Sequence, residues 1–285
     1  MKKLRIIALS TALITSLLAS PAYAAAPTKP EKGKLSVYFL DVGQGDATYI
    51  KTPNGDDILI DGGNNNYGDD VVNDLKKLGV DDIEVMISTH PDADHVGGLD
   101  AVLTAFKVES VYAPKVSHTT QTFKDFLNAV KTEKLTIKEA KAGIKLPLKG
   151  IDATFVGPTK AYAKSDLNDW SAVLRIVNGK NSFLFTGDAE TKSETDMIAS
   201  KVTLKADVLK VGHHGSDTSS SAAFVKAVAP KYAVISVGAK NSYGHPTQTT
   251  LSTLKNAKAT VYRTDKNGTI TFVSDGTKIT VKTEK

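Results

Sequence analysis

The apolar residues of this chain follow two different periods in alternating segments. Short runs rich in Val, Ile and aromatic residues predict β-strands, whereas longer segments with apolar residues on one helical face predict helices. In the first half, the pattern predicts strands at 35–42, 47–52, 56–63, 83–89 and 110–113, and helices at 69–79, 98–106 and 119–133.

The second half repeats this organisation. It is predicted to contain strands at 151–158, 206–212 and 232–238, a hairpin at 171–188, helices at 189–199, 222–229 and 248–257, and a closing hairpin at 260–283. Two β-rich blocks, each followed by alternating strands and helices, predict two related halves within one domain. Because two facing sheets with helices outside them bury such elements, we expect an α/β fold with four αββα layers.

The chain begins with "MKKLRIIALSTALITSLLASPAYAAA", which has a basic start, a short apolar stretch and a small-residue end. This pattern is typical of a secretory signal peptide, and Ala22-Tyr23-Ala24 fits a cleavage site. We therefore predict a signal peptide at 1–24, a linker at 25–33 and the folded domain at 34–285. The mature protein is expected to be secreted, without stable membrane insertion.

Charge and composition restrict the function only weakly. The net charge of the whole chain is +5, and loss of Lys2, Lys3 and Arg5 with the predicted signal peptide would leave +2. A general attraction to nucleic acid is therefore not required. The chain contains no cysteine, so an exported domain must be stabilised by its core, and any metal must be bound by imidazole or oxygen ligands.

The segment "STHPDADHVGG" places His90, Asp92, Asp94 and His95 just after a predicted strand. We expect this segment to form a turn before a helix that begins near Gly97. Alternate residues of an extended segment point to the same side, so the first two residues suit one metal ion and the last two suit a second. The alternative, a solvated loop with an Asp helix cap, explains only one residue of the four.

Other polar residues also follow predicted strands. Asp188 ends one strand and is suited either to bridge two cations or to cap the next helix. His213 and His214 lie between glycines after another strand, Asp61 precedes two glycines, and His245 lies in a turn. Five of the six histidines thus lie at strand ends or in the loops just after them, which indicates a site rather than scattered polar residues.

These motifs resemble those of the metallo-β-lactamase superfamily, whose signature H-x-[HD]-x-D-H is matched by "HPDADH". The ordered motifs "FLDVGQGDATYI", "LIDGG", "FTGDAE", "LKVGHHGS" and "YGHP" are similar to those of the hydrolase domain of the competence protein ComEC and its secreted stand-alone relatives. The resemblance covers about residues 35–283. It implies a single αββα hydrolase domain that binds two divalent metal ions, zinc or manganese.

The resemblance also implies which residues bind the ions. The implied ligands are His90 and Asp92 for the first ion, Asp94, His95 and His214 for the second, and Asp188 as a bridge between them. Asp92 stands where many members have histidine, which makes the first position more tolerant of manganese. The further histidine that the superfamily has before the bridging aspartate lacks a clear counterpart, and we interpret His118 as a surface residue.

The remaining candidates would act around these ligands. Asp61 would orient the ligands and the attacking water, and together with Asp94 and His245 it makes up the candidate catalytic set. His245 would bind phosphate or protonate the leaving group. His213, Ser216 and Asn168 would lie near the substrate or behind the ligands.

Two divalent ions lower the pKa of a shared water and polarise the bond that it attacks, so we expect hydrolysis by a metal-bound hydroxide. The aspartate-rich site favours a phosphodiesterase or nuclease, with DNA as a candidate substrate, over a β-lactamase. A phosphorylcholine esterase is the alternative enzyme, and it would need an aromatic cage from Trp170 with Tyr162 or Tyr243. A non-catalytic surface-binding protein on the same scaffold is the alternative from another class. No obligate protein partner is evident, and a role in DNA uptake is not predicted.

Overall fold

The computed structural model describes residues 28–285, so the predicted signal peptide and the first residues of the predicted linker lie outside the described residues. Residues 28–33 form neither helix nor strand, and the Tyr38 hydroxyl donates a hydrogen bond to the Thr28 carbonyl at 2.7 Å. Within this range, no helix combines the length and the apolar character needed to cross a bilayer.

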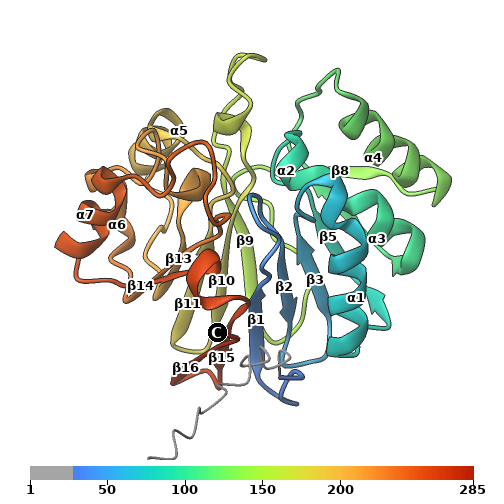
Figure 1. Ribbon diagram of the computed structural model, residues 1–285, viewed down its shortest axis with the longest axis horizontal. Coiled ribbons are helices and arrows are strands. Elements are labelled where there is room, and N and C mark those ends of the chain that lie inside the picture. Colours follow the sequence, from blue (N-terminus) through green and yellow to red (C-terminus); the bar gives the residue numbers. More distant parts are fainter. Residues whose placement is uncertain (1–27) are drawn as a thin grey trace, which may run out of the picture.

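Two sheets form the centre of the domain (Figure 1). Across the larger sheet, the strands are in the order β16 (Ile279–Thr283), β15 (Ile270–Ser274), β1 (Leu35–Phe39), β2 (Thr48–Lys51), β3 (Asp57–Ile60), β5 (Val85–Ile87), β7 (Val111–Ala113) and β8 (Ile137–Glu139). The smaller sheet has the order β14 (Thr260–Arg263), β13 (Tyr232–Ile235), β12 (Val208–Lys210), β11 (Asn181–Phe185), β10 (Val173–Asn178) and β9 (Asp152–Gly157). A separate short pair is formed by β4 (Asp82–Ile83) and β6 (Lys107–Val108).

Helices cover the outer sides of the two sheets, so the four αββα layers are present (Figure 1). Beside the larger sheet lie α1 (Gly68–Leu78), α2 (Ala93–Val96), α3 (Leu99–Ala105) and α4 (Gln121–Thr132). Beside the smaller sheet lie α5 (Thr191–Ala199), α6 (Ala222–Val228) and α7 (Gln248–Asn256). The short helices η1 (Asn65–Tyr67), η2 (Asn168–Trp170), η3 (Gly212–Gly215) and α8 (Thr264–Asn267) lie in connections.

Alternation along the strands builds the core. On β1, Leu35, Val37 and Phe39 belong to the apolar cluster between the sheets, whereas Tyr38 belongs to the cluster under the helices. The Phe39 and Phe272 rings meet edge to face at 5.9 Å between the sheets. Because side chains of a strand point alternately to opposite faces, each sheet is buried on both sides.

Parallel pairing brings the important loops together. β3, β5, β7 and β8 are parallel neighbours in the larger sheet, and β11 to β14 are parallel neighbours in the smaller one. Parallel strands have their carboxyl ends at one edge of a sheet, where sites of α/β proteins usually form. The loops after β3, β5, β11, β12 and β13 therefore end at edges from which side chains converge.

The predicted strands and helices are present with shifted ends, but the closing hairpin at 260–283 is wrong in part. β15 and β16 do form a hairpin, whereas β14 pairs in parallel with β13 in the other sheet. Between them, α8 and Gly268 turn the chain, and the Thr264 hydroxyl donates to the Val237 carbonyl at 3.1 Å. Two β-branched runs around Asn-Gly look like a hairpin, but their partners in space decide the pairing.

Candidate metal centre

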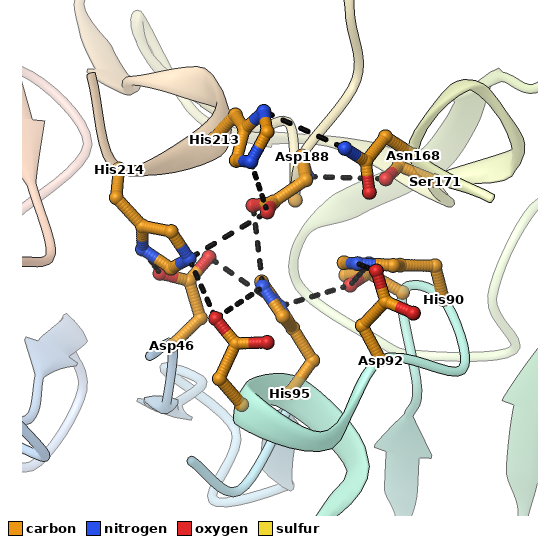
Figure 2. Close-up of polar contacts among 12 residues, drawn as sticks. Asp46, His90, Asp92, His95, Asn168, Ser171, Asp188, His213 and His214 are labelled. Carbon is orange, nitrogen blue, oxygen red and sulfur yellow. Dashed lines mark hydrogen bonds and ion pairs between the residues drawn. The ribbon is translucent and has the colours of Figure 1, made fainter. Parts of the chain in front are cut away.

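The polar residues that follow the predicted strands come together in the structure. Asp61 follows β3, His90 follows β5, Asp188 follows β11, and His213 and His214 lie in η3 after β12. The two halves of the chain therefore contribute side chains to one cluster (Figure 2).

A short additional helix precedes the predicted one: α3 begins at Leu99, close to the predicted start, and α2 lies in the segment expected as a turn. α2 starts at Ala93 with Asp92 as its N-cap residue, so Asp94 and His95 lie on the helix and not in a turn before it. The Asp92 side chain makes no capping hydrogen bond, and its Oδ2 lies 3.4 Å from His90 Nε2. The structure thus brings His90 and Asp92 together, and a helix rather than a loop carries the next two residues.

Asp61 orients His90 and His95 from behind. Its carboxylate accepts hydrogen bonds from the Thr89 backbone N–H at 2.8 Å and from the Thr89 hydroxyl at 2.7 Å, and its Oδ2 lies 2.9 Å from His95 Nδ1. The Thr89 hydroxyl oxygen is also 3.1 Å from His90 Nδ1. Since both Nδ1 atoms face acceptors, both Nε2 atoms are left as ligand atoms.

Asp188 lies at the centre of the cluster (Figure 2). Its Oδ1 is 3.2 Å from His95 Nε2, and its Oδ2 is 3.5 Å from His214 Nε2. The Asp188 backbone N–H donates to the Ser171 hydroxyl at 3.1 Å, which fixes the turn that carries it. The two carboxylate oxygens therefore face two different imidazoles, and a carboxylate placed in this way suits the bridging role that the resemblance implies.

His214 is positioned by an unusual backbone. Both His213 and His214 have positive φ angles, 47° and 53°, and Gly215 follows at 85°. A Cβ on Gly215 would lie 2.5 Å from the Pro246 Cβ, so only glycine fits this close approach of two turns. His214 Nδ1 donates to the Ser236 carbonyl at 2.9 Å, which leaves Nε2 facing Asp94 Oδ2 at 3.1 Å.

His213 lies at the outer side of the cluster (Figure 2). Its Nε2 is 3.7 Å from Asp188 Oδ2, and its Nδ1 is 3.1 Å from Glu190 Oε1. Asn168 also donates to Glu190 Oε1 at 3.2 Å, so its amide supports this histidine and not the first ion's ligands. The Thr218 hydroxyl donates to the same oxygen at 2.8 Å.

His245 and Ser216 lie beyond the ligands. The His245 ring centroid is 5.6 Å from that of His213, which places His245 beside the cluster without contact to Asp188. The Ser216 side chain is buried, and its hydroxyl accepts from the Thr218 N–H at 3.2 Å. The structure therefore does not direct Ser216 toward a substrate, because its hydroxyl holds the adjacent turn.

Two buried residues beside the ligands, Asp46 and Lys210, are absent from the predicted site. Asp46 Oδ1 is 3.4 Å from His214 Nδ1, and Asp46 Oδ2 is 3.8 Å from His95 Nδ1. The Lys210 ammonium pairs with Asp46 and donates to the Gly187 carbonyl at 3.4 Å. The available signals were an Asp after the glycines of "GQGD" and a lone lysine in the apolar run "ADVLKVG".

The central atoms fit metal ions. Among residues 28–285, His90 Nε2, His95 Nε2 and Asp188 Oδ1 are buried polar atoms without a hydrogen-bond partner. Ligand atoms of these three residues lie within 4.8 Å of one another, and so do those of Asp94, His95 and His214. Divalent ions bound by these atoms would offset the cost of burying them. The two groups have His95 in common, and Asp188 also faces His214, so the arrangement accommodates two ions.

The charges of the cluster also favour cations. Burial by itself would lower the pKa of His214, but Asp188, Asp46 and Asp94 raise it to about 10. Burial would raise the pKa of Asp188, but His95 and His214 hold it well below its ordinary value. Carboxylates that hold protons on buried imidazoles also attract divalent ions, which displace those protons on binding.

His118 is outside this cluster. It lies in the loop after β7 and belongs to none of the groups of ligand atoms found in the described part of the chain. His118 therefore does not supply the further histidine, and the candidate ligands of the first ion are His90, Asp92 and Asp188.

The chain belongs to the metallo-β-lactamase superfamily, since residues 40–239 match the model of that family. It is a hydrolase of this family, whose fold binds divalent metal ions, often two. It is 33% identical over 253 residues to ComE operon protein 3 of Bacillus subtilis (strain 168), covering 83% of this chain and 32% of that protein. It is 31% identical over 248 residues to Competence protein ComA of Neisseria gonorrhoeae, covering 86% of this chain and 33% of that protein.

These relatives are ComEC-related competence proteins, so the predicted resemblance is confirmed. The chain spans about a third of the length of the curated relatives that it matches. Among solved structures, YhfI from Bacillus subtilis gives a TM-score of 0.52 at 11% identity, covering 80% of this chain and 96% of that one. The diiron β-hydroxylase CmlA from Streptomyces venezuelae also gives a TM-score of 0.52, at 13% identity, covering 82% of this chain and 53% of that one. These two likenesses show the fold.

Proposed function

We propose that this protein is a secreted, metal-dependent phosphodiesterase that cleaves nucleic acids. The observation that carries the proposal is the convergence of three carboxylates and three imidazoles from both halves of the fold, namely Asp92, Asp94, Asp188, His90, His95 and His214. A ligand set with this many carboxylates suits hard ions such as manganese as well as zinc.

Divalent ions bound at these ligands would supply a water-derived nucleophile near neutral pH and offset the negative charge that develops at phosphorus. The residues of the chain would position the ligands and bind the substrate. Asp61 fixes the orientation of His95, and Asp188 lies between His95 and His214. His213 and His245, on the outer side, place ring N–H groups where phosphate oxygens and the leaving group would lie.

Nucleic acid is the substrate that the relatives support. The proteins that share this domain include one named for competence and another encoded in the ComE operon. A phosphodiester backbone is anionic, so it complements a site that carries cations and imidazole donors. The proposal does not include a role in DNA uptake, because this chain corresponds to only about a third of the length of those proteins.

Two aromatic residues of the phosphorylcholine alternative, Tyr162 and Trp170, do not form an open cage. The Tyr162 and Trp170 rings pack edge to face at 6.2 Å and are both buried. Lys192 and Lys160 lie over the Tyr162 ring at 5.5 and 5.7 Å, so cations of the protein itself already occupy its faces. A quaternary amine would therefore lack the free aromatic surface that it needs there.

DNA cleavage tests the proposal. Single- and double-stranded DNA are incubated with the mature protein in manganese, zinc or EDTA, beside Asp188→Ala and His118→Ala. We expect metal-dependent cleavage by the wild type and His118→Ala, and a loss of about 100-fold or more in Asp188→Ala. Two bound ions per chain without cleavage of any phosphodiester would contradict the proposal. A protein that binds no ion would instead support the non-catalytic alternative.

Secretion has its own test. The predicted signal peptide would be removed after Ala24, so protein recovered from the culture medium should begin at Ala25. N-terminal sequencing of the recovered protein measures this directly. Recovery of the intact chain from the cell interior alone would contradict this part of the proposal and leave the enzymatic part standing.

A further inference from the structure

Tyr243 is an exposed aromatic residue beside the outer histidines of the candidate metal centre. The residue is 69% exposed, whereas the other exposed large apolar residues of the described chain, Leu127 and Ile198, are each 37% exposed. The Tyr243 ring stacks on His245 with centroids 5.7 Å apart and an interplanar angle of 24°. One face of the ring is thus supported, and most of the side chain is accessible.

Successive contacts between neighbouring rings relate Tyr243 to the Asp188 carboxylate. His245 lies 5.6 Å from His213, ring centre to ring centre, and His213 Nε2 lies 3.7 Å from Asp188 Oδ2. The order from the cluster outward is Asp188, His213, His245 and Tyr243. A substrate whose phosphate lies at Asp188 and His213 would therefore extend past His245 to the phenol ring.

The loop that carries Tyr243 is held in place. Asn241 Oδ1 accepts from the backbone N–H groups of Tyr243 at 3.2 Å and His245 at 3.0 Å. The Asn241 amide donates to the carbonyls of His245 at 2.7 Å and Gly238 at 3.0 Å. Gly238 N–H in turn donates to the Gln44 side chain at 3.1 Å. The ring is therefore presented on a fixed loop, so little ordering is needed when a ligand binds.

We propose that Tyr243 is a stacking platform for the nucleobase next to the scissile phosphate. This inference rests on the proposed nuclease function and adds a binding subsite to it. A nucleobase has a flat π face, and stacking on an aromatic side chain tolerates every base, which suits cleavage without sequence preference. No other interaction in the structure uses the exposed face of this ring among residues 28–285.

Two esters with the same leaving group test the platform. Thymidine 5′-(p-nitrophenyl) phosphate carries a base, and methyl p-nitrophenyl phosphate does not. In Tyr243→Ala, we expect the ratio of kcat/KM for the nucleotide ester over the methyl ester to fall by about 5- to 100-fold. Tyr243→Phe keeps the ring and should keep the ratio, and Leu127→Ala is the control for loss of an exposed apolar side chain. An unchanged ratio in Tyr243→Ala would overturn the inference, whether both esters keep their kcat/KM or both lose it equally.

Binding separates the platform from the catalytic proposal. Fluorescence anisotropy in EDTA compares a labelled thymidine oligonucleotide with an abasic oligonucleotide of the same length. Tyr243→Ala should weaken binding of the thymidine oligonucleotide by about 5- to 100-fold. The variant should then bind the thymidine and abasic oligonucleotides with similar affinities. If the wild type hydrolyses neither ester but binds the base-containing strand more tightly through Tyr243, the platform stands and the hydrolytic proposal fails. If p-nitrophenyl phosphorylcholine is the ester that depends on Tyr243, the ring binds a quaternary amine and the nucleobase inference is overturned.

Discussion

Lys210 and Asp46 form an ion pair in which the side chains are only 3% and 5% exposed. Asp46 comes from the loop between β1 and β2, and Lys210 ends β12 in the other sheet. The pair lies beside His214 and His95, so it joins the two halves of the ligand cluster from behind. Burial would raise the pKa of Asp46, but Lys210 and His214 bring it below the ordinary value.

Breaking this pair should be costly. Lys210→Met leaves the Asp46 charge buried without its cation, so we expect a loss of about 3–5 kcal/mol in the free energy of unfolding, measured by urea denaturation. The double variant Asp46→Asn/Lys210→Met should recover most of this loss. Lys231→Met removes the exposed partner of Asp207 and should cost less than about 1 kcal/mol. Equal effects of Lys210→Met and Lys231→Met would show that the buried pair has no special role.

Asp61→Asn should weaken metal binding without removing a ligand. The amide cannot accept from Thr89 and His95 in the way that both carboxylate oxygens do, so the His95 ring loses its fixed orientation. We expect the affinity for manganese or zinc to fall by about 10- to 100-fold in calorimetric titrations. Asp69→Asn, on the exposed side of α1, is the control. Unchanged affinity in Asp61→Asn would mean that packing alone orients His95.

Metal ions should stabilise the fold. Ions that bind only the native state raise the free energy of unfolding by about 2.7 kcal/mol at one hundred times Kd. Protein treated with EDTA should therefore melt at a lower temperature than protein with manganese restored, in a calorimetric scan. Asp94→Asn, which keeps the side-chain shape, should lower the bound metal from two ions toward one. Two tightly bound ions in this variant would contradict the assignment of Asp94 to the second ion.

Asp57, which lies outside the candidate metal centre, should make the free energy of unfolding depend on pH. Burial raises its pKa to about 6, although Lys51 and Tyr49 act in the opposite direction. Because the folded protein binds this proton more tightly than the unfolded chain does, protonation stabilises the fold at low pH. That stabilisation, on the order of 2–3 kcal/mol, is lost as the pH rises from about 4 to about 6.

Urea denaturation between pH 4 and 7 measures this effect. Asp57→Asn cannot ionise, so its free energy of unfolding should fall less steeply than that of the wild type over this range. Asp70→Asn, an exposed carboxyl on α1, should follow the wild-type curve. Parallel curves for the wild type and Asp57→Asn would show that Asp57 stays ionised in the fold throughout.

The sequence by itself determined the elements of the fold and indicated most of the residues of the candidate site. Periodicity located the strands, and polar residues at their ends, such as His90 and Asp188, indicated a site because parallel strands end at one edge. The superfamily motifs then assigned roles to those residues. These features depend on short segments of the chain, which is why they could be predicted without coordinates.

The tertiary structure decided what depends on contacts between distant segments. The sheet that β14 joins, the ion pair of Asp46 with Lys210, and the support of His213 by Glu190 and Asn168 all join parts of the chain far apart in sequence. Local propensity does not specify such pairings, because burial and partner geometry determine them. Likewise, only the folded chain shows that Tyr243 is exposed beside the metal centre while Tyr162 is buried.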